Sequence, residues 1–180
     1  MLEIYEKELA ELKQDMIGLG MKVEQAVEST WKALERKDVE LAQRIFDGDD
    51  AIDELVKSCM KKDLTISLMQ GPVAADYRSL MATLKILSDL ERIADHCADI
   101  SHYVIHLKQT NHDVPLPAGV KEMYGVMSSM VSDVIDFYKE RGTSSQAEFM
   151  RDKDDIVDQA FNNLMLDLSA EMTKHPENSK

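Results

Sequence analysis

The stretch DLERIADHCADIS, residues 89–101, decides how the chain is organised. On an α-helix, Glu91, Asp95 and Asp99 recur every four residues and therefore share one face. A separate apolar stripe follows alternating steps of three and four: Ile86, Leu90, Ile93, Cys97, Ile100, Val104 and Leu107. The stretch predicts a long amphipathic helix whose row of carboxylates contains no Lys or Arg. Such a row is either a solvated acidic face or a place where a cation or a basic partner binds.

The composition and the periodicity of the whole chain predict an all-α fold. Its 180 residues include twelve Met but only seven Gly and four Pro, which leaves little material for turns. We expect an antiparallel bundle of long helices over residues 2–35, 38–69, 73–108, 120–140 and 145–173. Asp38 is predicted to cap the second helix, and Ser145 with Glu148 to cap the fifth.

Apolar residues of the first two helices predict which of their faces form the core. The first helix has a heptad seam, and the second has a shorter stripe. The seam comprises Leu9, Leu12, Met16, Leu19, Val23, Ala26, Thr30 and Leu34, and the stripe comprises Leu41, Ile45, Ile52, Val56 and Cys59.

The net charge of −13 excludes several classes of partner. Nucleic acid requires a basic surface, and anionic lipid repels an acidic one. No apolar run reaches the length of a membrane span, and the residues after Met1 do not resemble a signal peptide. Cys59 and Cys97 are isolated, which favours reduced thiols and a cytoplasmic protein.

The sequence also repeats itself. Residues 16–19 (MIGL) match residues 123–126 (MYGV), and the pair Asp49/Asp53 matches Asp154/Asp158. We therefore expect tandem three-helix repeats: a first over 1–108, a linker over 109–119, and a second over 120–180 in which the sixth helix is missing.

Without that helix, the fourth and fifth helices should leave an apolar groove. We expect another copy of the chain, or a continuation past Lys180, to cover it. Its predicted lining is Met127, Met130, Val134, Ile156, Val157, Phe161 and Leu164.

Two acidic pairs indicate a candidate metal site. Asp49/Asp53 and Glu91/Asp95 lie on successive antiparallel helices, so up to four carboxylates can surround one hard cation. Asp154/Asp158 would supply half of a second such site. His102 and His106 continue the acidic face, either as metal ligands or as exposed side chains at a helix end. No nucleophile–base arrangement or phosphate loop stands out, and an enzyme is not predicted.

Two motifs resemble those of the PhoU family, bacterial regulators of phosphate uptake. Residues 89–95 (DLERIAD) resemble the family signature D-L-E-R-I-G-D, and residues 70–78 (QGPVAADYR) resemble Q-x-P-x-A-x-D-L-R. The tandem three-helix repeat is similar to the family as well. Ala94 replaces the family's Gly, Tyr77 replaces Leu, and Val56 stands where an acidic residue is usual.

The resemblance implies metal ions, divalent or ferric (iron, Mn, Mg or Zn), bound by E/D-xxx-D pairs. It carries this role to Asp49, Asp53, Glu91 and Asp95, and to Asp154 and Asp158 for a second site. It further implies a homodimeric, non-enzymatic negative regulator of phosphate uptake and of the Pho regulon.

Such a regulator would be an adaptor between the ATPase subunit of a Pst-type phosphate ABC transporter and a sensor histidine kinase. It would reach the membrane only through these protein partners. The alternative is a metal-dependent enzyme or a metal store built on a carboxylate bundle.

Overall fold

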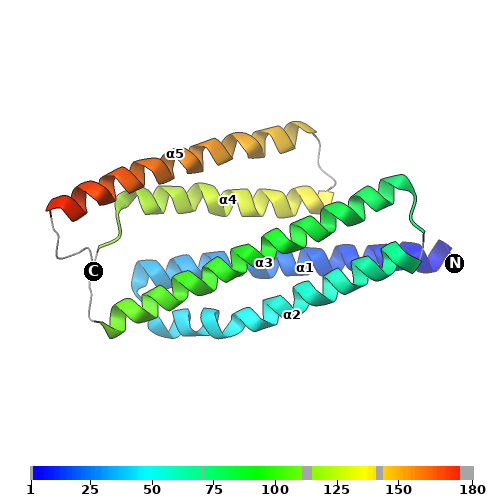
Figure 1. Cartoon of the computed structure of the whole chain (residues 1–180), viewed down its shortest axis with the longest axis horizontal. Helices are drawn as coiled ribbons and strands as arrows, with labels where there is room; N and C mark the ends of the chain where they lie inside the picture. Colours follow the sequence, from blue (N-terminus) through cyan, green and yellow to red (C-terminus); the bar gives the residue numbers. More distant parts are fainter. Residues whose placement is uncertain (1, 70, 111–114, 141–143, 175–180) are drawn as a thin grey trace. The chain divides into compact units, whose positions relative to one another are not determined.

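The protein is built from five α-helices in the parts of the chain that the structure describes, residues 2–69, 71–110, 115–140 and 144–174. In this computed structural model they are α1 (Leu2–Arg36), α2 (Val39–Met69), α3 (Ala74–Gln109), α4 (Ala118–Glu140) and α5 (Ser144–Lys174) (Figure 1). No strand occurs among these residues, which confirms the all-α prediction. No helix in the described ranges is long and apolar enough to cross a membrane. The chain divides into two compact units, Met1–His106 and Leu107–Lys180.

The turns of the first unit follow the local sequence. The Leu41 amide donates a 2.9 Å hydrogen bond to Asp38 Oδ1, which confirms Asp38 as the N-cap of α2. Gly71 has φ +57°, a left-handed conformation that glycine adopts without steric cost, and it ends α2 next to Pro72. The predicted cap at Ser145 is wrong, because α5 already includes Ser144 and Ser145.

The core of the first unit lies where the predicted stripes of α1, α2 and α3 meet, with local shifts. Along α1, the seam residues from Leu12 to Val23 and also Thr30 are buried, whereas Val27 and Ala33 are buried in place of the half-buried Ala26 and Leu34. An α-helix has 3.6 residues per turn, so a strict 3.5-residue pattern drifts around it. Ala33 belongs to a buried apolar cluster that also contains Ala42 of α2 and Val104 of α3.

Small residues, rather than the isoleucines, bring α3 close to its neighbours. Ala94, Ala98 and Ser101 are buried, whereas Ile93 is half-buried and Ile100 is exposed. Leu90, Cys97 and Val104 of the predicted stripe are buried as well. The buried face of α3 therefore includes part of that stripe and extends to the small residues beside it.

One acidic residue lies entirely in this core. Asp63 of α2 is 0% exposed, and neither of its carboxyl oxygens makes a hydrogen bond to a described residue. Burial raises the pKa of Asp63 to about 6, an increase that Ser67, one turn later, partly offsets. An ionised carboxylate in such a place lowers the stability of the folded state.

The second unit is a hairpin in which α4 packs on α5. Lys153 of α5 contacts Asp133 Oδ2 at 2.5 Å and Ser129 Oγ at 3.1 Å, both on α4. The predicted groove residues have mixed exposure: Leu164 is buried, Met127, Met130 and Val157 are half-buried, and Val134, Ile156 and Phe161 are exposed. The second copy or further chain expected to cover them stays a prediction.

We expect Asp63→Asn to stabilise the folded protein at pH 8. Because the folded-state pKa lies above the ordinary 3.8, the cost of ionising Asp63 appears as the pH rises from about 4 to about 6 and is fully present above that. A difference of about two pKa units corresponds to roughly 3 kcal/mol at most. Urea unfolding of both proteins at pH 8 and pH 4.5 measures this, and an equal difference at both values would contradict it.

The two units should differ in independent stability. We expect residues 1–106 to unfold cooperatively on heating, because three helices share a buried core. Residues 107–180 should show a broad transition, since among their described residues only Val131, Ile135 and Leu164 are buried apolar side chains. Calorimetry of the two separate fragments measures the difference. A sharp transition in a monomeric 107–180 fragment would contradict it.

Candidate metal centre

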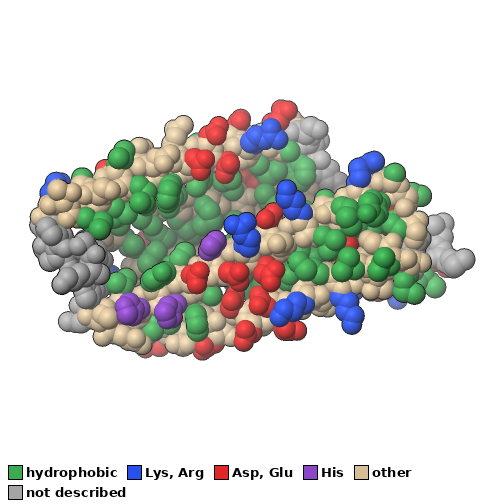
Figure 2. All heavy atoms as spheres, in the orientation of Figure 1, with side chains coloured by type: hydrophobic (Ala, Val, Ile, Leu, Met, Phe, Trp, Pro, Cys, Tyr) green, Lys and Arg blue, Asp and Glu red, His purple; other side chains and the backbone are tan. Residues whose placement is uncertain are grey.

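Three aspartates from two helices converge on the α2·α3 side of the first unit. Asp49 and Asp53 lie one turn apart on α2, and Asp95 lies on α3. One carboxylate oxygen from each lies within 4.8 Å of the others. Figure 2 shows acidic side chains gathered over the middle of these two helices. The structure thus brings together three of the four residues predicted for the first site.

The three carboxylates are poorly compensated by the protein itself. The Oδ1 atoms of Asp49 and Asp53 are buried and have no hydrogen-bond partner among the described residues. Burial raises the pKa of Asp49, and the charges of Asp95, Asp53, Asp50 and Asp99 raise it further. Buried acceptors with neither donors nor cations are rare in folded proteins, so this cluster has the electrostatics of a cation site.

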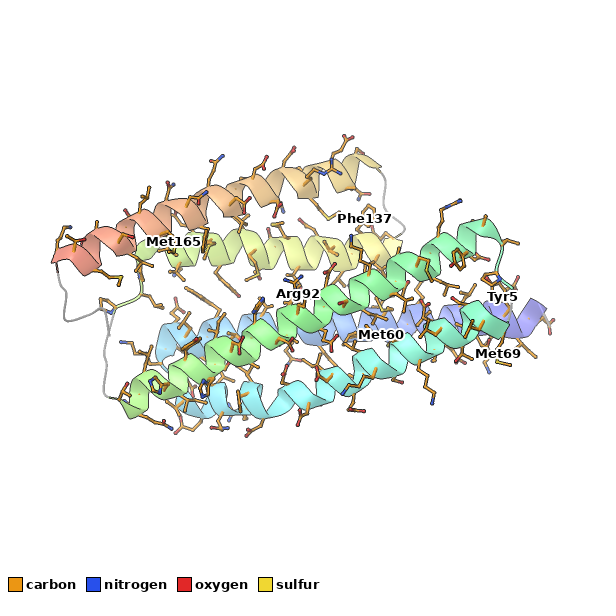
Figure 3. The ribbon with its side chains drawn as sticks, viewed as in Figure 1. Tyr5, Met60, Met69, Arg92, Phe137 and Met165 are labelled. Atoms are coloured by element: carbon orange, nitrogen blue, oxygen red, sulfur yellow. The ribbon has the colours of Figure 1, made fainter. Side chains whose placement is uncertain are left out.

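Glu91 lies one turn along α3 from Asp95 and outside the group of three. It lies close to Lys57, whose pKa is raised first by its hydrogen bond to Glu54 and more weakly by Asp53 and Glu91. Arg92 of the same motif points away from α2 (Figure 3). Glu91 therefore lies at the edge of the centre, on the side where the positive charge of Lys57 partly offsets the negative charge of the carboxylates.

His102 and His106 lie at the other end of the acidic face, whereas His96 directly follows Asp95. The ring of His102 packs on Phe46, with 5.6 Å between the centroids, and His96 Nδ1 is 3.9 Å from Asp99 Oδ2. No cluster of three metal-ligating side chains in the described part of the chain contains a histidine. The candidate centre is therefore an all-oxygen one.

Asp154 and Asp158, predicted to supply half of a second site, are exposed on α5. No third ligand joins them within the described ranges. Their metal-binding role stays a prediction.

The three aspartates fit a hard cation. With metal–oxygen bonds of about 2.1–2.4 Å, ligands on opposite sides of an ion lie roughly 4.2–4.8 Å apart. The three carboxylate oxygens lie within 4.8 Å of one another, so they are close enough together to share one ion. Oxygen-only ligands suit Mg²⁺, Ca²⁺, Mn²⁺ or iron. A bound ion would neutralise the acids and hold α2 against α3.

Comparison with known proteins identifies the family. Residues 16–104, which contain all three aspartates, match the family model described as the PhoU domain. Two curated relatives are named phosphate-specific transport system accessory protein PhoU homologue. The one from Clostridium acetobutylicum is 32% identical over 96% of this chain and 80% of its own length. The one from Aquifex aeolicus is 30% identical over 97% of this chain and 78% of its own length.

Solved structures agree with the sequence comparison. The fold matches the crystal structure of the phosphate transport system regulatory protein PhoU from Streptococcus pneumoniae with a TM-score of 0.86, 27% identity, and coverage of 95% of this chain and 80% of that one. PhoU from Pseudomonas aeruginosa has the same fold, with a TM-score of 0.91 at 24% identity over 96% of this chain and 82% of that one. The chain belongs to the PhoU family.

Proposed function

We propose that the protein is a negative regulator of phosphate uptake and of the phosphate-starvation response. Family membership carries this proposal, because the curated relatives are named as accessory proteins of the phosphate-specific transport system. The regulator acts in the cytoplasm by contact with two partners, the ATPase subunit of the phosphate ABC transporter and a sensor histidine kinase. It catalyses no reaction, and it binds a metal ion through Asp49, Asp53 and Asp95.

The metal has a structural part in this proposal. Without a cation, the three aspartates repel one another across α2 and α3. A cation converts that repulsion into a cross-link between the helices and fixes the shape of the α2·α3 face. The chemistry that the metal supplies is charge neutralisation at a protein surface. An enzyme or a metal store is the less favoured alternative, since transport accessory proteins act through contacts with other proteins.

Regulation is tested in the source bacterium. We expect deletion of the gene to raise phosphate uptake and starvation-gene expression in phosphate-rich medium, and the wild-type gene to restore repression. Labelled-phosphate uptake and a starvation-promoter reporter measure the two effects. Unchanged uptake and unchanged expression after deletion would refute the proposed function.

Metal binding is tested separately with Asp49→Asn combined with Asp95→Asn. We expect this variant to lose the bound metal, measured by elemental analysis and by titration calorimetry with Mn²⁺. Asp47→Asn with Asp50→Asn is the matched control, because it removes two charges from exposed positions beside the site and should still bind.

The metal-free fold should not depend on the three aspartates. Relief of their repulsion should leave the apo stability of the Asp49/Asp95 variant unchanged or higher by about 0.5 kcal/mol. Metal retained by this variant, or a wild type that binds none, would refute the site.

A further inference from the structure

A cluster of exposed apolar side chains surrounds the turn between α2 and α3. It comprises Leu64, Leu68 and Met69 of α2 with Val73, Tyr77 and Met81 at and after the turn, and is called here the turn patch. Leu68 is 83% exposed, Met69 77% and Val73 68%. Figure 2 shows hydrophobic side chains gathered over these joined helix ends, and Figure 3 marks Met69 at the end of α2. Single exposed apolar residues are ordinary, but a contiguous group of this kind marks an interaction site.

The turn patch does not belong to the core of its own unit. The buried residues of these helix ends are Ile66 on α2 and Leu80 on α3, which lie on the inner faces. The patch lies on the same side as the metal centre: Met60 and Leu64 follow Asp53 by two and three helical turns, and Met81 precedes Asp95 by four. Met60 lies on the side of α2 that faces α3 (Figure 3).

Unpaired cations border the turn patch on both helices. Lys61 is on α2, and Arg78 and Lys85 are on α3; all three are exposed. None of them has an ion-pair partner among the described residues. In a chain of net charge −13, these three cations give the surroundings of the patch a positive charge that an acidic counterpart would complement.

The end of the bundle that presents the patch is held in place. Tyr5 of α1 donates a 2.9 Å hydrogen bond to Asp76 at the start of α3, which ties this turn to α1. The patch is therefore displayed on a fixed scaffold, which lowers the entropy lost when a partner binds.

We propose that the turn patch docks a partner protein whose surface has apolar side chains bordered by carboxylates. This inference rests on the proposed function. Of the two partners proposed there, we take the transporter's ATPase subunit, because the curated relatives are named as accessory proteins of the transport system. A protein can place its carboxylates opposite Lys61, Arg78 and Lys85 one by one. A membrane of anionic lipid would meet the acidic centre on the same side and be repelled by it.

The experiment measures binding of the full chain to the purified ATPase subunit. One variant removes apolar contacts, Leu64→Ser with Leu68→Ser, and another reverses charges, Lys61→Glu with Lys85→Glu. Met21→Ser and Lys22→Glu on α1 are matched controls, because both positions are exposed and lie outside the α2·α3 side. Thermal unfolding and metal content of every variant report whether the fold and the metal centre are intact.

We expect each double variant to bind the ATPase subunit at least tenfold more weakly, while the controls bind as the wild type does. The charge-reversal loss should shrink at high salt, since screening removes the attraction that it reverses. Because all substituted side chains are exposed, folding should survive in every variant.

Several results would overturn the inference. Unchanged binding of the ATPase subunit by folded double variants would overturn this inference but leave the proposed function standing. Loss of kinase binding only, loss of self-association in sedimentation, or loss of binding only to vesicles of phosphatidylglycerol would each assign the patch to another occupant. A wild-type chain that binds no ATPase subunit would overturn the proposed function, and this inference with it.

Discussion

Close packing of α3 against its neighbours is the constraint on which the α2·α3 side depends. Ala94, Ala98 and Ser101 are buried, and small side chains of this kind let a helix pack closely against its neighbours. Asp95 immediately follows Ala94, so the rotation that buries the alanine also brings that carboxylate to Asp49 and Asp53. A larger residue at position 94 would turn or displace the helix and separate the three acids. The packing of α3 and the position of a carboxylate in the candidate metal centre thus depend on two adjacent residues, Ala94 and Asp95.

The fold was predictable because helical periodicity is repeated over long segments. Asp38 and Gly71 set the bounds of α2 through local chemistry, and the cap at Asp38 was predictable from sequence. The choice of buried face was harder. In α3 the predicted stripe contains the buried Leu90, Cys97 and Val104 but also the exposed Ile100, and only the contact of three helices selects the small residues beside it. Asp63 was missed for a related reason, because nothing in the sequence marks a carboxylate as buried.

The candidate site was predicted in part because helical periodicity also fixes the spacing of its acidic residues. Spacing of four residues places Asp49 and Asp53 on one face, and antiparallel helices bring a second pair opposite. The register between α2 and α3, which sequence does not give, decides that Asp95 joins them while Glu91 lies toward Lys57. The turn patch was invisible as a surface, since Leu64, Leu68 and Tyr77 have the composition of a core.

The metal centre and the turn patch lie on one side of the bundle, and distance decides how strongly they can influence each other. At about 1.5 Å per residue, Lys61 lies roughly 12 Å along α2 from Asp53, and Leu68 roughly 22 Å. Charges at a protein surface are largely screened beyond about 8–10 Å at physiological ionic strength. Even at the inner edge of the patch, near Met60 and Lys61, a cation at the centre therefore changes the potential only weakly. The exposed tip formed by Leu68, Met69 and Val73 is electrically independent of the metal, so any stronger coupling has to pass through the relative positions of α2 and α3.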